Sequence, residues 1–98
     1  MTIIDDYLEH QERFVKEYGE NTIVLMQVGH FFESYGLDND KERSNADNLY
    51  RLCDIMNIQL TRKNKNIKEN SRKNPLMIGV NLYSIDKYIQ ILLNANYT

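Results

Sequence analysis

The stretch "NTIVLMQVGHFFESYG", residues 21–36, joins an apolar run to two phenylalanines and a glutamate, and it raises the question of function. Its first half, 21–28, is a short apolar run rich in β-branched residues that ends at Gly29. Such a run, bounded by polar residues and glycine, is typical of a central strand buried on both faces. The chain then passes through His30 into two phenylalanines and a glutamate, so we expect an extended segment over 30–35.

Side chains in an extended segment alternate between two faces. The two sets are Phe31, Glu33 and Tyr35 on one face, and His30, Phe32 and Ser34 on the other. One phenylalanine can therefore lie in the core while the other is exposed. Taken alone, these residues favour Phe31 as the core residue with Glu33 at the rim, because phenylalanine is usually buried.

The rest of the chain supplies three amphipathic helices and further short strands. Helical spacing predicts a helix over 6–19 that Asp6 caps and Gly19 ends, and a second helix over 44–57 with Ser44 and Asp47 as a capping box. A third helix begins after Ser84, with an inner face of Ile85, Tyr88, Ile89 and Leu92. Residues 58–63 and 76–81 are typical of strands. We therefore predict an α/β fold, a small mixed β-sheet flanked by about three helices.

Length and composition predict one small domain over residues 1–98. No apolar run approaches the roughly 20 residues that span a bilayer, so we expect no membrane association, and the first residues lack the pattern of a signal peptide. Cys53 is the one cysteine, which favours an intracellular, reducing compartment. The last residues resemble the start of another strand, so we expect the chain to be an excerpt of a longer protein.

Charge is distributed unevenly along the chain. Residues 1–57 carry twelve acidic and five basic side chains, whereas 58–98 carry seven basic and two acidic ones. Six of these bases lie from Arg62 to Lys73, and residues 64–74 have no periodicity, so we expect them to form an exposed basic loop. A local basic segment suits a polyanionic partner even when the net charge is close to zero.

From Lys16 through "EYGENTIVLMQVGHFFE" (17–33), the chain resembles the N-terminal mismatch-recognition domain of the MutS family of DNA mismatch-repair proteins. In that family a helix bearing a lysine leads to a hydrophobic strand and then to Gly-Asp-Phe-Tyr-Glu, which here reads Gly29-His30-Phe31-Phe32-Glu33. The segments "IQLTRK" (58–63), "NPLMIGVN" (74–81) and "DKYIQILL" (86–93) follow in the family's order. The resemblance covers nearly the whole chain.

The resemblance implies that the chain reads mismatched or unpaired bases in double-stranded DNA without catalysing a reaction. By position, Phe31 would stack on the mispaired base as a wedge, Glu33 would hydrogen-bond that base, and Phe32 would face the protein. Stacking an aromatic ring on a base contributes roughly 1–3 kcal/mol. Unstacking a base step costs a few kcal/mol and costs least where pairing is already poor, so a wedge favours mismatches.

Further expectations concern phosphates, cofactors and partners. Arg62 and Lys63, at the end of a strand, are candidates for phosphate contacts, whereas Lys65, Lys68, Arg72 and Lys73 are expected to be mobile. The chain has no Walker motif, so we expect no cofactor in it. The resemblance implies ATP and magnesium in other regions of the parent polypeptide, and a dimeric parent.

The chain departs from the family pattern at three positions. His30 replaces an aspartate, and Ile78 and Asn81 replace an alanine and a proline. We expect His30 to alter how the turn is held, and the changes at Ile78 and Asn81 to alter local packing.

Two other functions remain open on the sequence. One is a small metal-dependent nuclease that uses Glu33 and Asp38 with Lys63, although the chain shows no clustered set of metal ligands. The other is a MutS-like domain retained only for a structural or protein-interaction role. Exposure of Phe31 distinguishes this last alternative from DNA reading.

Overall fold

A computed structural model of the chain describes residues 3–68 and 70–98. Its helices and strands, in chain order, are α1 (Ile3–Tyr18), β1 (Met26–Val28), β2 (Phe31–Asp38), β3 (Arg43–Ser44), α2 (Ala46–Met56), β4 (Thr61–Arg62), β5 (Leu76–Asn81), the 3₁₀ turn η1 (Leu82–Ser84) and α3 (Ile85–Asn94). The predicted α/β class is confirmed. None of these helices combines the length and the hydrophobicity that crossing a membrane requires.

The sheet is built around the long pairing of β2 with β5. The strand order is β1-β2-β5-β4, and β3 pairs with β2 outside this path. The β2–β5 register runs from Phe31 opposite Asn81 to Gly36 opposite Leu76. Every ladder between these strands is antiparallel, so the sheet is antiparallel rather than mixed as predicted, and an isolated parallel bridge joins Leu37 and Asn45.

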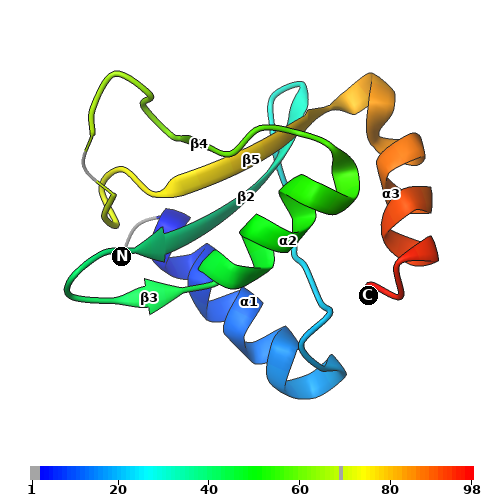
Figure 1. The fold of residues 1–98 in the computed structure, drawn as a ribbon, viewed down its shortest axis with the longest axis horizontal. Coiled ribbons are helices and arrows are strands. Elements are labelled where there is room, and N and C mark those ends of the chain that lie inside the picture. The colour runs from blue at the N-terminus through cyan, green and yellow to red at the C-terminus, as the bar shows by residue number, and fades with distance from the viewer. Residues whose placement is uncertain (1–2, 69) are drawn as a thin grey trace.

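Helices cover the two faces of the sheet unequally (Figure 1). On one face, α2 and α3 pack over a core cluster that includes Leu49, Leu52, Ile78, Val80 and Leu92. On the other face, α1 packs against the C-terminal half of β2, in a cluster formed by Ile4, Tyr7, Leu8, Tyr35 and Leu37. The turn between β1 and β2 lies at the end of the sheet remote from β3 (Figure 1).

The prediction of a doubly buried central strand over 21–28 is wrong. Only Met26–Val28 forms a strand, and it lies at the edge of the sheet. Residues 22–25 are irregular, and side chains replace the missing ladder. The amide of Gln11 donates to the carbonyl of Thr22 (2.7 Å) and accepts from the backbone N–H of Val24 (2.8 Å). An apolar run alone does not distinguish such a partly buried irregular segment from a strand.

The end of the chain also lies beside this irregular segment. The backbone N–H of Ile23 donates to the carbonyl of Thr98 (3.1 Å), and the N–H of Thr98 donates to the carbonyl of Asn21 (2.9 Å). Tyr97 is 5% exposed, and its hydroxyl donates to Asn48 Oδ1 (2.6 Å). Thr98 is thus tied to the start of the segment 21–28, whereas Tyr97 is tied to α2.

Helix starts differ from the predictions, whereas the predicted end of α1 is confirmed. Gly19, at φ +106°, follows the last residue of α1. The expected capping box of α2 is absent, because Ser44 belongs to β3 and the N-cap is Asn45, in a left-handed conformation without a side-chain cap. Ser84 likewise makes no side-chain cap for α3.

Three boundaries or faces were also predicted inaccurately. α1 begins at Ile3 rather than Asp6, and the strand expected over 58–63 is limited to Thr61–Arg62. Ile89, expected on the inner face of the last helix, is 41% exposed. The segment Leu76–Asn81 forms β5 as predicted.

Candidate nucleic-acid interface

A two-residue turn sets the position of Phe31. Val28 pairs with Phe31 across the turn formed by Gly29 and His30. Gly29 has φ +60°, a conformation that favours glycine at the first position of a tight hairpin turn. The carbonyl of the exposed His30 accepts from the backbone N–H of Leu82 (2.7 Å), which ties the turn to the end of β5.

The two phenylalanines lie on opposite faces of the sheet, as their alternation predicted. Phe32 is half-buried and packs against the core cluster under α2 and α3. Phe31 is 48% exposed, and its neighbours in register are Val28, itself 44% exposed, and Asn81. The interpretation that places Phe31 in the core is therefore wrong, because α1 reaches only the far half of β2 on that face.

Glu33 lies on the same face as Phe31, two positions further along β2 and closer to the part of the strand that α1 covers. Its neighbours across the sheet are Met26 of β1 and Gly79 of β5. Because Gly79 has no side chain, β5 contributes none beside Glu33. Glu33 is half-exposed, and its Oε1 accepts a hydrogen bond from the hydroxyl of Tyr35. The uncovered part of this face thus carries an exposed aromatic ring next to a carboxylate.

Arg62 and Lys63 have different surroundings. The guanidinium of Arg62 donates from Nε to the carbonyl of Ile67 (2.6 Å) and from Nη2 to the carbonyl of Lys65 (2.9 Å). Lys63 Nζ lies 6.0 Å from the centre of the Tyr35 ring. The structure therefore brings Lys63 to the face that carries Phe31 and Glu33, whereas Arg62 holds the basic loop.

The basic loop is held by many contacts in the part of the chain that the structure describes. Arg72, expected to be mobile, donates to Asp5 Oδ1 (2.6 Å) and forms an ion pair with Glu42 (3.1 Å), so these contacts link the loop to α1 and to the residue before β3. Its neighbour Asn70 donates to the carbonyl of Asp38 (2.8 Å). Beside β4, the loop borders a hollow of about 790 Å³ whose lining includes Arg62, Lys63, Lys65 and Lys73 and no acidic residue among those described.

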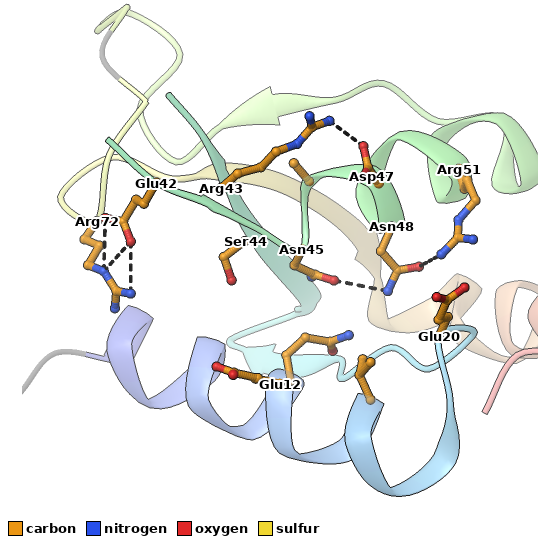
Figure 2. A pocket seen from close by; sticks show the side chains of 13 residues that line it. Glu12, Glu20, Glu42, Arg43, Ser44, Asn45, Asp47, Asn48, Arg51 and Arg72 are labelled. Atoms are coloured by element: carbon orange, nitrogen blue, oxygen red, sulfur yellow. Dashed lines mark hydrogen bonds and ion pairs between the residues drawn. The ribbon is translucent and has the colours of Figure 1, made fainter. Parts of the chain in front are cut away.

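A second hollow, of about 740 Å³, lies between α1 and the segment from β3 to α2 (Figure 2). Its lining contains both acidic and basic side chains, some of which pair with one another. Arg43 contacts Asp47, and Arg72 contacts Glu42, as Figure 2 shows. This cleft is distinct from the face that carries Phe31, and its charges largely balance.

The residues proposed for a nuclease are not brought together. Glu33 and Asp38 are five positions apart in β2, so their side chains leave opposite faces of the strand. Asp38 accepts from the hydroxyl of Tyr50 (2.7 Å) and lies 4.0 Å from the Arg43 guanidinium. Across residues 3–68 and 70–98, no three His, Cys, Asp or Glu side chains are grouped as a metal site would require.

Sequence reasoning missed three contacts, one made by Tyr35 and two made by Arg72. The hydrogen bond from Tyr35 to Glu33 was foreseeable in part, because residues two apart on a strand share a face. The ion pairs of Arg72 join residues 30 and 67 positions apart, for which local periodicity contains no signal.

The chain is related in sequence to a MutS homologue. It is 34% identical, over 98 residues and 99% of its length, to a protein of Acanthamoeba polyphaga mimivirus named "Putative DNA mismatch repair protein mutS homolog L359". The matched region is 8% of that protein, so the chain spans a small part of its relative. No family model matches the chain.

Proposed function

From this relationship and the exposed Phe31, we propose that the chain is the mismatch-recognition module of a MutS-like mismatch-repair protein. Its ligand is double-stranded DNA that contains a mispaired or unpaired base. The observation that carries the proposal is the division of the two phenylalanines, with Phe32 against the core and Phe31 48% exposed beside Glu33. An exposed aromatic ring contributes little to the core, but it can stack on a base that is easily unstacked.

Glu33 discriminates between the two kinds of duplex. A carboxylate held close to a polyanion is repelled unless it meets a hydrogen-bond donor. In a correctly paired duplex the ring N–H groups of the bases are engaged in pairing, whereas a base displaced by Phe31 can present such a group to Glu33. Glu33 therefore weakens binding to correctly paired DNA more than binding to a mismatch.

Lys63 supplies a phosphate contact on the same face, since its ammonium group lies near Tyr35. Arg62 keeps the adjacent loop in place, and its remaining N–H groups are available to a second phosphate. The module itself catalyses no reaction in this proposal. ATP hydrolysis with magnesium and dimerisation belong to other regions of the parent polypeptide, in a reducing compartment inside the cell.

The test compares binding of the complete, natively encoded protein to two duplexes that differ by one mismatch, at fixed salt. Phe31→Ala is expected to remove the preference for the mismatched duplex, because it removes the stacking contact. Val28→Ala is the matched control, since Val28 is a similarly exposed apolar neighbour in register. It should leave the preference unchanged.

Melting curves distinguish a lost contact from a lost fold. Phe31→Ala should change the free energy of unfolding by less than about 1 kcal/mol, whereas Phe32→Ala should lower it by about 2–4 kcal/mol, because Phe32 packs against the core. A folded Phe31→Ala protein that keeps the full mismatch preference would contradict the proposed function.

A further inference from the structure

Tyr35 combines a buried ring with a hydroxyl that reaches the half-exposed carboxylate of Glu33. The two residues lie two positions apart in β2 and share the face that carries Phe31. The side chain of Tyr35 is 1% exposed, and its hydroxyl donates to Glu33 Oε1. The side chain of Glu33 is thus attached by a hydrogen bond to a buried residue of the same strand.

The ring of Tyr35 is itself held in a fixed position. It packs edge-to-face against Tyr7, with ring centres 5.2 Å apart at 90°. Tyr7 in turn donates to the carbonyl of Val24 (2.8 Å), and Lys63 Nζ lies 6.0 Å from the Tyr35 ring centre. A donor on an immobile ring restricts the rotamers of the side chain that accepts from it.

The hydroxyl of Tyr35 keeps its proton at neutral pH. Burial, the hydrogen bond to Glu33 and the negative charge of Glu33 raise the pKa of Tyr35 well above its ordinary value. The group is therefore a constant donor to the carboxylate. A carboxylate has two oxygens, so engaging Oε1 leaves the second oxygen available to an external N–H group.

We propose that Tyr35 is a positioning residue for Glu33, which it holds through Oε1 so that the other carboxylate oxygen faces the displaced base. This role rests on the proposed function, because it assigns Glu33 to that base. The base group that Glu33 binds is then an N–H donor, such as the ring N–H of thymine or guanine, since the carboxylate can only accept. Tyr35 acts through Glu33 and does not itself contact DNA.

The experiment is a double-mutant cycle in the complete, natively encoded protein, with the ratio of mismatched to matched duplex affinity as the readout. Both duplexes are the same length, and the mismatch is a guanine opposite a thymine. Tyr35→Phe should lower the ratio about threefold to tenfold, which corresponds to the loss of one hydrogen bond. In a Glu33→Ala background, the same change should alter the ratio less than twofold, because the residue that it positions is gone.

Tyr97→Phe is the matched control, because it removes a hydroxyl from another buried tyrosine that is bonded to Asn48 rather than to Glu33. It should lower stability and leave the ratio unchanged. A Tyr35→Phe protein with an unaltered ratio would overturn the proposal. An equal loss in the presence and absence of Glu33 would also overturn it, since the hydroxyl would then act through the packing of the sheet.

A second measurement needs no DNA. Side-chain NMR couplings of Glu33 should report one rotamer in the unaltered protein and averaged rotamers in Tyr35→Phe. Averaging in both proteins would overturn the positioning role. The unaltered protein could also bind both duplexes equally while Glu33 keeps a single rotamer. That result would overturn the proposed function but would still show that Tyr35 fixes the rotamer of Glu33.

Discussion

At the scale of single residues, Arg62 and Lys63 show how sequence neighbours come to differ in function. They are adjacent bases at the end of a strand, and the sequence predicted the same phosphate-binding role for both. In the folded chain, Arg62 donates to two loop carbonyls, whereas Lys63 lies near the Tyr35 ring on the proposed reading face. A single step along a strand turns a side chain to the other face, so adjacent residues meet different surroundings.

This difference predicts different consequences for DNA binding. Lys63→Ala should weaken binding to matched and mismatched duplexes equally, and reduce the slope of log affinity against log salt by about 0.9, the value for one phosphate contact. It should leave the melting temperature unchanged. The measurement is a salt series for both duplexes, and an unchanged slope would remove Lys63 from the interface.

Arg62→Ala is the companion variant. Because its N–H groups satisfy carbonyls of the basic loop, we expect this change to lower stability as well as affinity. Identical behaviour of the two variants, in stability and in salt slope, would contradict the division of roles.

At the scale of elements, the irregular segment 22–25 is held by helix side chains in place of a ladder. Gln11 of α1 is 3% exposed and pairs with both the Thr22 carbonyl and the Val24 N–H. Asn48 of α2 donates to the same Thr22 carbonyl (2.9 Å). Two helices from distant parts of the chain therefore meet on one stretch of backbone, whose polar groups would otherwise be buried without partners.

We expect a substitution at Gln11 that keeps the length of the side chain to lower stability substantially. Gln11→Met keeps the length of the side chain but leaves the Val24 N–H without its partner, so stability should fall by about 1–3 kcal/mol. Gln90→Met in α3 is the control, because Gln90 is exposed and should tolerate the change within about 0.5 kcal/mol. Urea unfolding of both variants provides the measurement, and equal midpoints would contradict this account of the segment.

At the scale of the whole molecule, buried tyrosines occur on both sides of the sheet. Tyr7 belongs to α1 and packs with Tyr35 of β2 on one side, whereas Tyr97 belongs to the cluster under α2 and α3. Burial raises the pKa of Tyr7 to about 12 and also raises the pKa of Tyr97. Each of these groups is therefore easier to ionise in the unfolded chain than in the folded one.

The direction of the shift determines the pH dependence of stability. Because the folded-state pKa of Tyr7 exceeds its unfolded value of 10.0, its contribution is complete below pH 10 and is lost as the pH rises toward 12. The loss from Tyr7 amounts to about 2–3 kcal/mol. Urea unfolding between pH 8 and pH 12 measures it, and Tyr7→Phe should flatten this decline in part. Parallel declines in both proteins would contradict the assignment to Tyr7.

Part of the fold and part of the site could be predicted because they depend on local geometry. Turn chemistry predicted the end of α1 at Gly19. The repeat of two residues along a strand predicted the shared face of Phe31, Glu33 and Tyr35, and the strand pattern predicted β5 over 76–81. The prediction of a central strand over 21–28 was wrong, because an apolar run indicates burial but does not indicate which groups hydrogen-bond its backbone.

The direction of each side chain in β2 follows from the sequence alone, since alternation along a strand needs no distant partner. Which face of the strand is covered, and along what length, depends on the tertiary structure. Helix α1 reaches Tyr35 and Leu37 but not Phe31, so one end of a single strand face is core and the other is open. Likewise, Asp5 meets Arg72 across 67 positions. Such coverage depends on contacts between distant segments, and a local pattern specifies the direction of a side chain without specifying what packs against it.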